Sequence, residues 1–370
     1  MKPAPLKSDV HHRLYSLDVL RGFDMFWITG GGMLAIVIAQ ATGWNWLEVQ
    51  MEHVKWEGFH FYDLIFPLFM FISGVAIPLS IESKLEKSVP ARRLVKKALS
   101  RFVLLILLGI IYNGALKNGF GNARYASVLG QIGFGYFFAS LIVIFVRSEK
   151  YRLIWLTGIL LFVALIQLLF PVPGFGSGVL TPEGCVNGWI DRNILPGRLH
   201  GGTFDPEGLL CNVSAIAITL MGSFAGKILR NRQTGDWNKI IRLSVTGGSL
   251  IILSLIIGIW YPVIKACWTT TFNLLAGGIS FVLMAFFFMV IDHWKYRKWA
   301  FYFRVIGLNS IFVYLFVRIV DITSISKFFT GWTVALLGEQ AGGLVVLLGG
   351  LAIIWGVLYF LYKKEVFVRI

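Results

Sequence analysis

Charged residues are scarce in this chain of 370 residues, making up 14% of it, whereas hydrophobic residues make up 56%. Soluble domains carry roughly 25% charged residues. The apolar residues also gather in runs close to the roughly 20 residues that a helix needs to cross the hydrocarbon layer of a bilayer. A spanning helix satisfies its own backbone hydrogen bonds there. The composition excludes an ordinary soluble enzyme and predicts an all-α, polytopic membrane helix bundle.

Several motifs of soluble enzymes are also missing. The sequence contains no Walker loop, no glycine-rich strand–helix fingerprint, no GxSxG elbow and no HExxH zinc motif. Its three cysteines, Cys185, Cys211 and Cys267, form no CxxC pair and no zinc spacing. A disulfide between Cys185 and Cys211 is one option, because all three lie at or near the predicted outer face. We expect no metal site.

Ten apolar stretches predict transmembrane helices, and the third of them is the shortest. They are 21–41, 60–80, 102–116, 126–146, 153–171, 209–229, 241–261, 270–291, 304–320 and 341–362. No charged linker and no repeat of fixed period divides the chain, so we expect one transmembrane domain over residues 1–370. Two outer connections, about 42–59 and 172–208, exceed a simple turn, and long loops tend to carry function.

The net charge of +15 reports the orientation of the chain in the membrane. With the N-terminus inside, 26 of the 34 Lys and Arg residues fall in cytoplasmic segments, whereas the reverse orientation would invert this asymmetry. We therefore predict that both termini are cytoplasmic and that the basic loops meet an anionic leaflet. We expect no nucleic-acid partner, and the loop-poor architecture suggests a bacterial cytoplasmic membrane.

Two residues near the second apolar stretch are the catalytic candidates. His53 precedes that stretch, and a neutral imidazole can accept a proton near physiological pH. The alternative is an interfacial histidine beside tryptophans. Asp63 lies four residues before Pro67, where a carboxylate needs a partner or a wet cavity. The alternative for Asp63 is a carboxylate that only braces helix packing.

A second polar group lies at the predicted cytoplasmic mouth of the first stretch. Asp18 and Arg21 are spaced i, i+3 and share one helix face. One interpretation is an ion pair that fixes the entry of the chain. The other is that Arg21, helped by Arg13 and the basic stretch 92–101, receives the phosphates of a cytoplasmic cofactor.

Four further polar residues stand out in or beside apolar stretches. Asp205 and Glu207 open the sixth stretch; helix capping by itself accounts for Asp205 but not for Glu207. Lys265 lies in a tight outer turn. Asn309 lies inside the ninth stretch, where a hydrogen bond to another helix is the default. From the residues alone, we predict a bundle with polar groups at both mouths, and no particular reaction.

Seven blocks of sequence, in order from residue 12 to about 316, carry a family resemblance. They are HRLYSLDVLRG (12–22), HVKWEG (53–58), DLIFPLFMFISG (63–74), VLGQIG (128–133), FDPEGLL (204–210), PVIKACWT (262–269) and GLNSIFVY (307–314). Together they make the chain resemble the heparan-α-glucosaminide N-acetyltransferase family of membrane acyltransferases. The lysosomal members carry a large additional lumenal region and a preceding helix, both of which we expect this chain to lack.

The resemblance implies an enzyme that transfers acetyl from cytoplasmic acetyl-CoA to the amine of a glucosamine-type sugar beyond the membrane. It puts His53 at the catalytic histidine position, and we assign Asp63 as its partner. We assign the donor site to Arg13, Asp18 and Arg21. The residues that we assign to the acceptor are Trp56, Asp205, Glu207, Lys265, Trp268 and Asn309. A homodimer is a further expectation.

Three features depart from the family pattern. Ile28 or Thr29 replaces the asparagine before the triple glycine, the stretch from Gly32 to His53 is longer, and Gln131 replaces an arginine. They bear on the acceptor and on oxyanion stabilisation more than on acetyl transfer. Two alternatives stay open: an O-acyltransferase of a cell-envelope glycan, and a proton-coupled transporter, which the lack of paired broken-helix repeats disfavours. Direct attack and an acetyl-histidine intermediate also both stay open.

Overall fold

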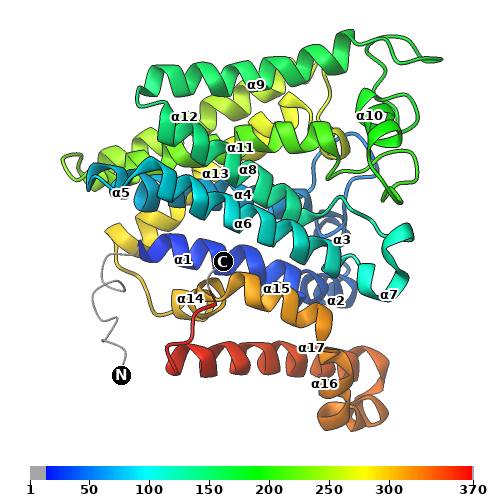
Figure 1. Cartoon of the computed structure of the whole chain (residues 1–370). Helices are drawn as coiled ribbons and strands as arrows, with labels where there is room; N and C mark the ends of the chain where they lie inside the picture. Colours follow the sequence, from blue (N-terminus) through cyan, green and yellow to red (C-terminus); the bar gives the residue numbers. More distant parts are fainter. Residues whose placement is uncertain (1–13, 369–370) are drawn as a thin grey trace. The chain divides into compact units, whose positions relative to one another are not determined.

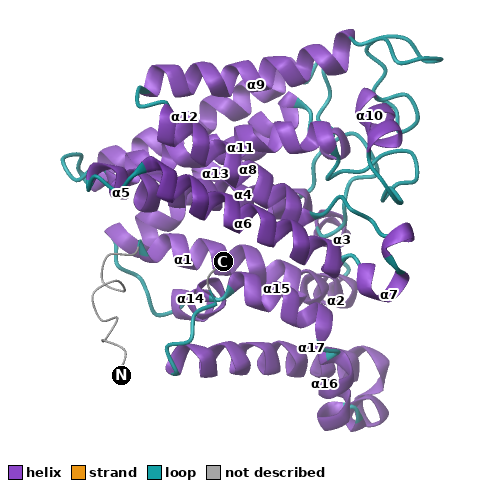
Figure 2. Ribbon diagram, viewed as in Figure 1, coloured by secondary structure: helices purple, strands orange, loops and turns teal. Residues whose placement is uncertain are grey.

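The computed structural model describes residues 14–368, apart from the side chains of Lys117 and Asn118 (Figure 1). Helices make up the regular structure of this part of the chain, joined by loops that carry three isolated β-bridges (Figure 2). The prediction of an all-α protein is confirmed. The described chain divides into two compact units, so the prediction of one domain over residues 1–370 stays a prediction.

The larger unit comprises Glu52–Gly235 and Arg242–Val282. At its centre α4 and α11 approach so closely that a Cβ on Gly74 would lie 2.0 Å from the Thr219 carbonyl oxygen, and one on Gly222 2.0 Å from that of Phe71. Small residues let membrane helices meet backbone to backbone. The helices wholly in this unit are α4 (Phe61–Ile77), η3 (Pro78–Glu82), α5 (Ser83–Glu86), α6 (Ala91–Tyr112), α7 (Ala115–Asn118), η4 (Phe120–Asn122), α8 (Val128–Phe145), α9 (Glu149–Leu169), α10 (Val186–Ile194), α11 (Leu209–Arg230) and η5 (Lys265–Cys267). Most of α12 (Asp236–Ile257) and α13 (Thr270–Phe288) also belongs to it.

The smaller unit comprises Met1–Met51, Asp236–Ile241 and Leu283–Arg369. Here α1 packs against α14, because Gly22 and Gly307 leave room for the facing backbone: a Cβ on either would lie within 2 Å of a carbonyl oxygen. Its helices are α1 (Tyr15–Phe26), η2 (Trp27–Gly31), α2 (Gly32–Thr42), α3 (Asn45–Gln50), η6 (Met289–His293), α14 (Ala300–Leu308), α15 (Ser310–Ile319), α16 (Ile322–Thr330) and α17 (Trp332–Lys363).

Within residues 14–368, eight helical segments are long and apolar enough to cross a membrane, or nine if α14 and α15, bent by 77° at Asn309, form one span. The sequence predicted ten. The exception is 102–116, which falls in α6. That helix carries Arg92, Arg93, Lys96 and Lys97 in its first turns, so its apolar part is only about 16 Å long.

Candidate active site

The larger unit brings together His53, Asp63 and Lys265. The Nδ1 atom of His53 lies 2.7 Å from Oδ1 of Asp63. Nζ of Lys265 lies 3.0 Å from that nitrogen and 3.1 Å from the same carboxylate oxygen. The Asp63 side chain is 1% exposed, whereas that of His53 is 55% exposed. The cluster therefore has a buried carboxylate at its base and an accessible imidazole at its surface.

Asp63 occupies its place because it is the third residue of α4. Its Oδ2 atom accepts hydrogen bonds from the backbone N–H groups of His60, at 3.1 Å, and Val54, at 3.3 Å. The first N–H groups of a helix lack intrahelical partners, and the helix dipole favours a negative charge there. Asp63 thus closes the loop onto α4 and also faces His53, so it has the partner expected of a carboxylate at this place.

Two groups face Nδ1 of His53, and each suits a different tautomer. An ionised carboxylate only accepts hydrogen bonds, so the tautomer that donates its Nδ1–H to Asp63 keeps its lone pair on Nε2. The Lys265 ammonium can donate to Nδ1 in the other tautomer, or to Oδ1 of Asp63. In the first tautomer the histidine takes up a proton at Nε2, and the carboxylate stabilises the resulting imidazolium. The geometry is that of a general base.

Lys265 reaches the cluster because two loops pair along their backbones. Gly58 donates its N–H to the Val263 carbonyl at 2.8 Å, and Glu57 forms an isolated antiparallel bridge with Ile264. Lys265 follows directly and begins the short helix η5. Burial lowers the pKa of the Lys265 ammonium, and the charge of Asp63 opposes that shift.

A second charged cluster lies in the same unit. Arg124 binds Asp205 through two hydrogen bonds, from Nε at 2.8 Å and from Nη2 at 2.5 Å, and its Nη2 also contacts the Glu207 carboxylate. Asp205 is fully buried and Glu207 nearly so. The sequence analysis missed Arg124. Its positive charge was the available signal, because few basic residues lie on the predicted outer side and each of them stands out there.

Burial and neighbouring charges shift the pKa values of Glu207 and Asp205 in opposite directions. Burial, reinforced by the charge of Asp205, raises the pKa of Glu207 to about 7, against the opposing effects of Arg124 and Lys265. Burial also tends to raise the pKa of Asp205, but its bonds to Arg124 and to backbone N–H groups outweigh this, so its pKa is lowered. The pKa of Glu207 therefore lies above that of Asp205.

Electrostatic interactions link the two clusters. Lys265 acts on Glu207 as well as on Asp63. His200, whose backbone N–H donates to Asp205 at 3.0 Å, has its pKa lowered by burial and by the charges of Arg124 and His53. The structure therefore gathers His53, Asp63, Lys265 and the Arg124 cluster into one charged region.

The two predicted tryptophans support the loops around this region. Trp56 is half-buried, donates its indole N–H to the Leu180 carbonyl at 2.6 Å and packs edge-on against Phe204. Trp268 is fully buried and packs between Phe66 and Phe272. Both side chains therefore position loop segments, and Trp56 keeps part of its surface accessible.

The cysteines do not form the disulfide considered from sequence. Cys185, Cys211 and Cys267 are all free thiols and all buried. Cys185 interacts with Cys267, whereas Cys211 accepts a hydrogen bond from Asn187 at 3.3 Å. Among the described residues, no cluster of three or more His, Cys, Asp or Glu side chains is arranged to hold a metal ion.

The remaining predicted residues belong to the smaller unit. Asp18 and Arg21 form an ion pair of 3.5 Å along α1, as expected for i, i+3 neighbours. Arg13 lies outside the described residues. Asn309 bonds the segment after α17: its amide donates to the Val366 carbonyl at 3.1 Å and accepts from the Val368 N–H at 2.9 Å. These contacts give Asn309 a bracing role between segments of this unit.

Comparison with known proteins identifies relatives, although no family model matches the chain. It is 25% identical to heparan-alpha-glucosaminide N-acetyltransferase of Mus musculus, over 97% of this chain and 61% of that protein. It is 27% identical to the Homo sapiens protein of the same name, over 82% of this chain and 52% of that protein. The chain is therefore similar to this family over most of its length. The resemblance carried by the seven sequence blocks is thereby confirmed.

The similarity covers only part of each relative. The chain spans between about half and three fifths of the length of the two relatives. This similarity, together with the apolar helices, supports an integral membrane protein related to acyltransferases. The donor, the acceptor and the orientation across the membrane are proposals.

Proposed function

We propose that this protein transfers an acetyl group from cytoplasmic acetyl-CoA to the amine of a glucosamine-type sugar on the outer face of the membrane. One observation carries the proposal: an accessible imidazole, His53, is held by the buried carboxylate of Asp63 in a chain related to N-acetyltransferases. A general base of this kind is what an attacking amine requires, because it must lose a proton as the new bond forms.

The chemistry assigns a task to each member of the cluster. The acceptor nitrogen, as the neutral amine, attacks the thioester carbonyl while Nε2 of His53 removes a proton from that nitrogen. Asp63 stabilises the imidazolium, and Lys265 offsets the charge of Asp63 while His53 is neutral. When the carbon–sulfur bond breaks, the proton passes from His53 to the departing thiolate, giving the acetylated amine and the free thiol. An acetyl-histidine route uses the same Nε2 as the nucleophile.

The Arg124 cluster suits the acceptor. A sugar presents hydroxyl groups and an ammonium group, and buried carboxylates bind both strongly. Arg124 holds Asp205 by two hydrogen bonds, which leaves Glu207, with its pKa of about 7, as the adjustable member. Glu207 is therefore the residue that we assign to recognition of the acceptor amine or a neighbouring hydroxyl.

The donor is proposed to enter from the cytoplasmic side of the membrane. The excess of Lys and Arg in the connections that include 82–101 and 227–242 supports a cytoplasmic location for that face. Arg21, which forms an ion pair with Asp18, is our candidate for contacts to the donor phosphates. A bacterial cytoplasmic membrane and a homodimeric assembly complete the proposal.

Purified protein with labelled acetyl-CoA and a panel of amino sugars tests this function. Replacing His53 by Ala is expected to lower acetyl transfer by about 10²–10⁴-fold. His60→Ala is the matched control, because its imidazole belongs to the same loop but bonds the Glu52 carbonyl. Transfer by His53→Ala within a few-fold of the parent would remove His53 from the mechanism. Acetylation of hydroxyl-bearing glycans but not amines would make the enzyme an O-acyltransferase.

A further inference from the structure

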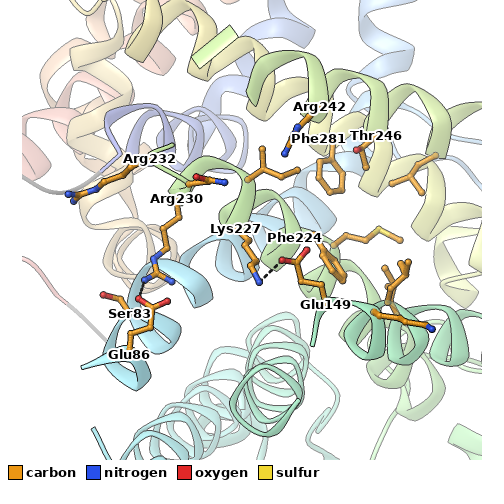
Figure 3. Close-up of a pocket in the computed structure, with 17 residues that line it drawn as sticks. Ser83, Glu86, Glu149, Phe224, Lys227, Arg230, Arg232, Arg242, Thr246 and Phe281 are labelled. Atoms are coloured by element: carbon orange, nitrogen blue, oxygen red, sulfur yellow. Dashed lines mark hydrogen bonds and ion pairs between the residues drawn. The ribbon is translucent and has the colours of Figure 1, made fainter. Parts of the chain in front are cut away.

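A cavity of about 850 Å³ lies in the larger unit, at the end where α9 begins and α11 ends, beside the early turns of α12 (Figure 3). Its size falls in the range of small-molecule and cofactor sites, about 300–1,000 Å³. None of its lining residues belongs to the His53 or Arg124 clusters. The reaction proposed above therefore does not account for it.

The lining of the cavity changes from charged to apolar along each of the three helices. On α9, the charged residues Glu149 and Lys150 are followed by Leu153 and Leu156. On α11, Arg230 and Lys227 are preceded by Phe224 and Met221. On α12, Arg242 is followed by Thr246 and Leu250. The eight-residue step from Arg242 to Leu250 rises about 12 Å along the helix axis. The cavity thus has one charged zone and one apolar zone, which is the shape of an amphiphile.

The charged zone holds more positive than negative groups. Five basic and two acidic side chains line it. Lys227 pairs with Glu149 at 2.6 Å, and Arg230 contacts Glu86. Figure 3 shows these pairs beneath Arg242, with Arg232 at the rim.

Three of the basic side chains have no ion pair or hydrogen bond with any part of the chain that the structure describes: Lys150, Arg232 and Arg242. Each is an exposed side chain. The lining of the cavity therefore carries a net charge of about +3. A ligand with an anionic group would neutralise part of this charge.

The surroundings of the cavity are those of lipid-facing helices. Both flanking helices expose large apolar side chains over much of their length: Leu153, Ile154, Trp155, Leu161 and Phe162 on α9, and Ile252, Leu253, Leu255 and Ile256 on α12. Leu153 belongs to both sets, since it lines the cavity and is 53% exposed. The apolar zone therefore continues into the surface that faces hydrocarbon.

We propose that this cavity binds one anionic phospholipid. Its phosphate group lies against Arg242 and Arg232, and the first part of its acyl chains follows the apolar zone past Leu153 and Phe224. Basic pockets between membrane helices on the cytoplasmic side bind acidic lipid headgroups. A soluble phosphate compound satisfies the charged zone but leaves the apolar zone unfilled, whereas a phospholipid fills both. The proposal stands apart from the acetyl-transfer chemistry at His53.

Native mass spectrometry of the full chain, titrated with dioleoylphosphatidylglycerol or dioleoylphosphatidylcholine, tests this proposal. The parent protein is expected to bind one phosphatidylglycerol more tightly than phosphatidylcholine. The double variant Arg232→Gln/Arg242→Gln should bind it about 30-fold more weakly, since each basic residue near an anionic headgroup contributes roughly fivefold. The matched control, Arg92→Gln/Arg93→Gln, removes the same charge from exposed positions on α6 and should change binding less than twofold.

A second variant tests the apolar zone without altering charge. Leu153→Trp fills part of that zone, and it should weaken phosphatidylglycerol binding while the melting temperature stays near that of the parent. Equal binding by the two double variants, or no preference for the anionic lipid, would overturn the proposal. So would inorganic phosphate or coenzyme A binding through Arg232 and Arg242 with no retained lipid, which would assign the cavity to a soluble ligand.

Discussion

The Nζ atom of Lys265 lies 3.1 Å from Oδ1 of Asp63, although 202 residues separate them in the chain. Asp63 is almost fully buried and Lys265 is 21% exposed at its side chain. A carboxylate removed from water is stable when it is paired and hydrogen-bonded. Because Asp63 is satisfied in this way, its carboxylate can stay ionised beside His53 and stabilise the imidazole when it gains a proton.

Asp63→Asn separates the two tasks of this carboxylate. The amide oxygen can still accept a backbone hydrogen bond at the start of α4, but the variant no longer offers a negative charge to His53. We expect kcat to fall at least about 100-fold, and the melting temperature to fall because Lys265 loses its counter-ion. Steady-state kinetics with amine acceptor, paired with thermal unfolding, check this. Unchanged kcat would show that Asp63 only caps the helix.

Arg124→Gln should destabilise the protein. It leaves the buried carboxylates of Asp205 and Glu207 without their shared cation, and removing one partner of a buried pair typically costs about 3–5 kcal/mol. The double variant Arg124→Gln/Asp205→Asn should recover part of the loss, because the ionised carboxylate without a cation is then absent. Thermal unfolding in detergent measures both variants. No recovery in the double variant would contradict the pairing with Asp205.

The raised pKa of Glu207 predicts that the free energy of unfolding depends on pH. Its pKa is about 7 in the folded protein and near the ordinary 4.5 when unfolded, so between these values the folded state holds a proton that the unfolded state has lost. Stability should therefore fall as pH rises from about 4.5 to about 7, by up to roughly 3 kcal/mol in total. Asp205 acts in the opposite sense, but only at lower pH because its pKa is lowered.

The variant Glu207→Gln isolates this effect. Its unfolding temperature should be less sensitive to pH across that window than that of the parent. Glu183→Gln, an exposed glutamate in the connection 172–208, serves as the control and should keep the parent's slope. Identical slopes in all three proteins would show that Glu207 is ionised throughout.

The two ends of α9 test the proposed orientation. Ser148 and Ser177 are exposed and lie before and after this helix, and the three native cysteines are buried, so background labelling should be low. In intact cells, Ser148→Cys should react with a membrane-impermeant maleimide only after permeabilisation, whereas Ser177→Cys should react at once. The reverse pattern would invert the orientation and place His53 on the cytoplasmic side.

Much of the architecture could be predicted from the sequence because its cause is local. A run of apolar residues must become a helix in a bilayer whatever surrounds it, and nine of the ten predicted stretches correspond to helical segments or to the bent pair that meet the length and composition test. The candidates His53, Asp63, Asp205 and Glu207 stood out for the same reason, since polar groups beside such runs are rare and costly.

Only the tertiary structure decided which of these polar groups meet. Arg124 lies 81 residues from Asp205 in the chain. It belonged to no prediction, because the residues next to it in the sequence do not indicate a carboxylate partner so far along the chain. Such pairings follow from which helices pack together, and at α4 and α11 this depends on glycines that admit a facing carbonyl. Hydrophobic patterning acts over a few residues and is readable along the chain, whereas charge pairing acts through space and requires the fold.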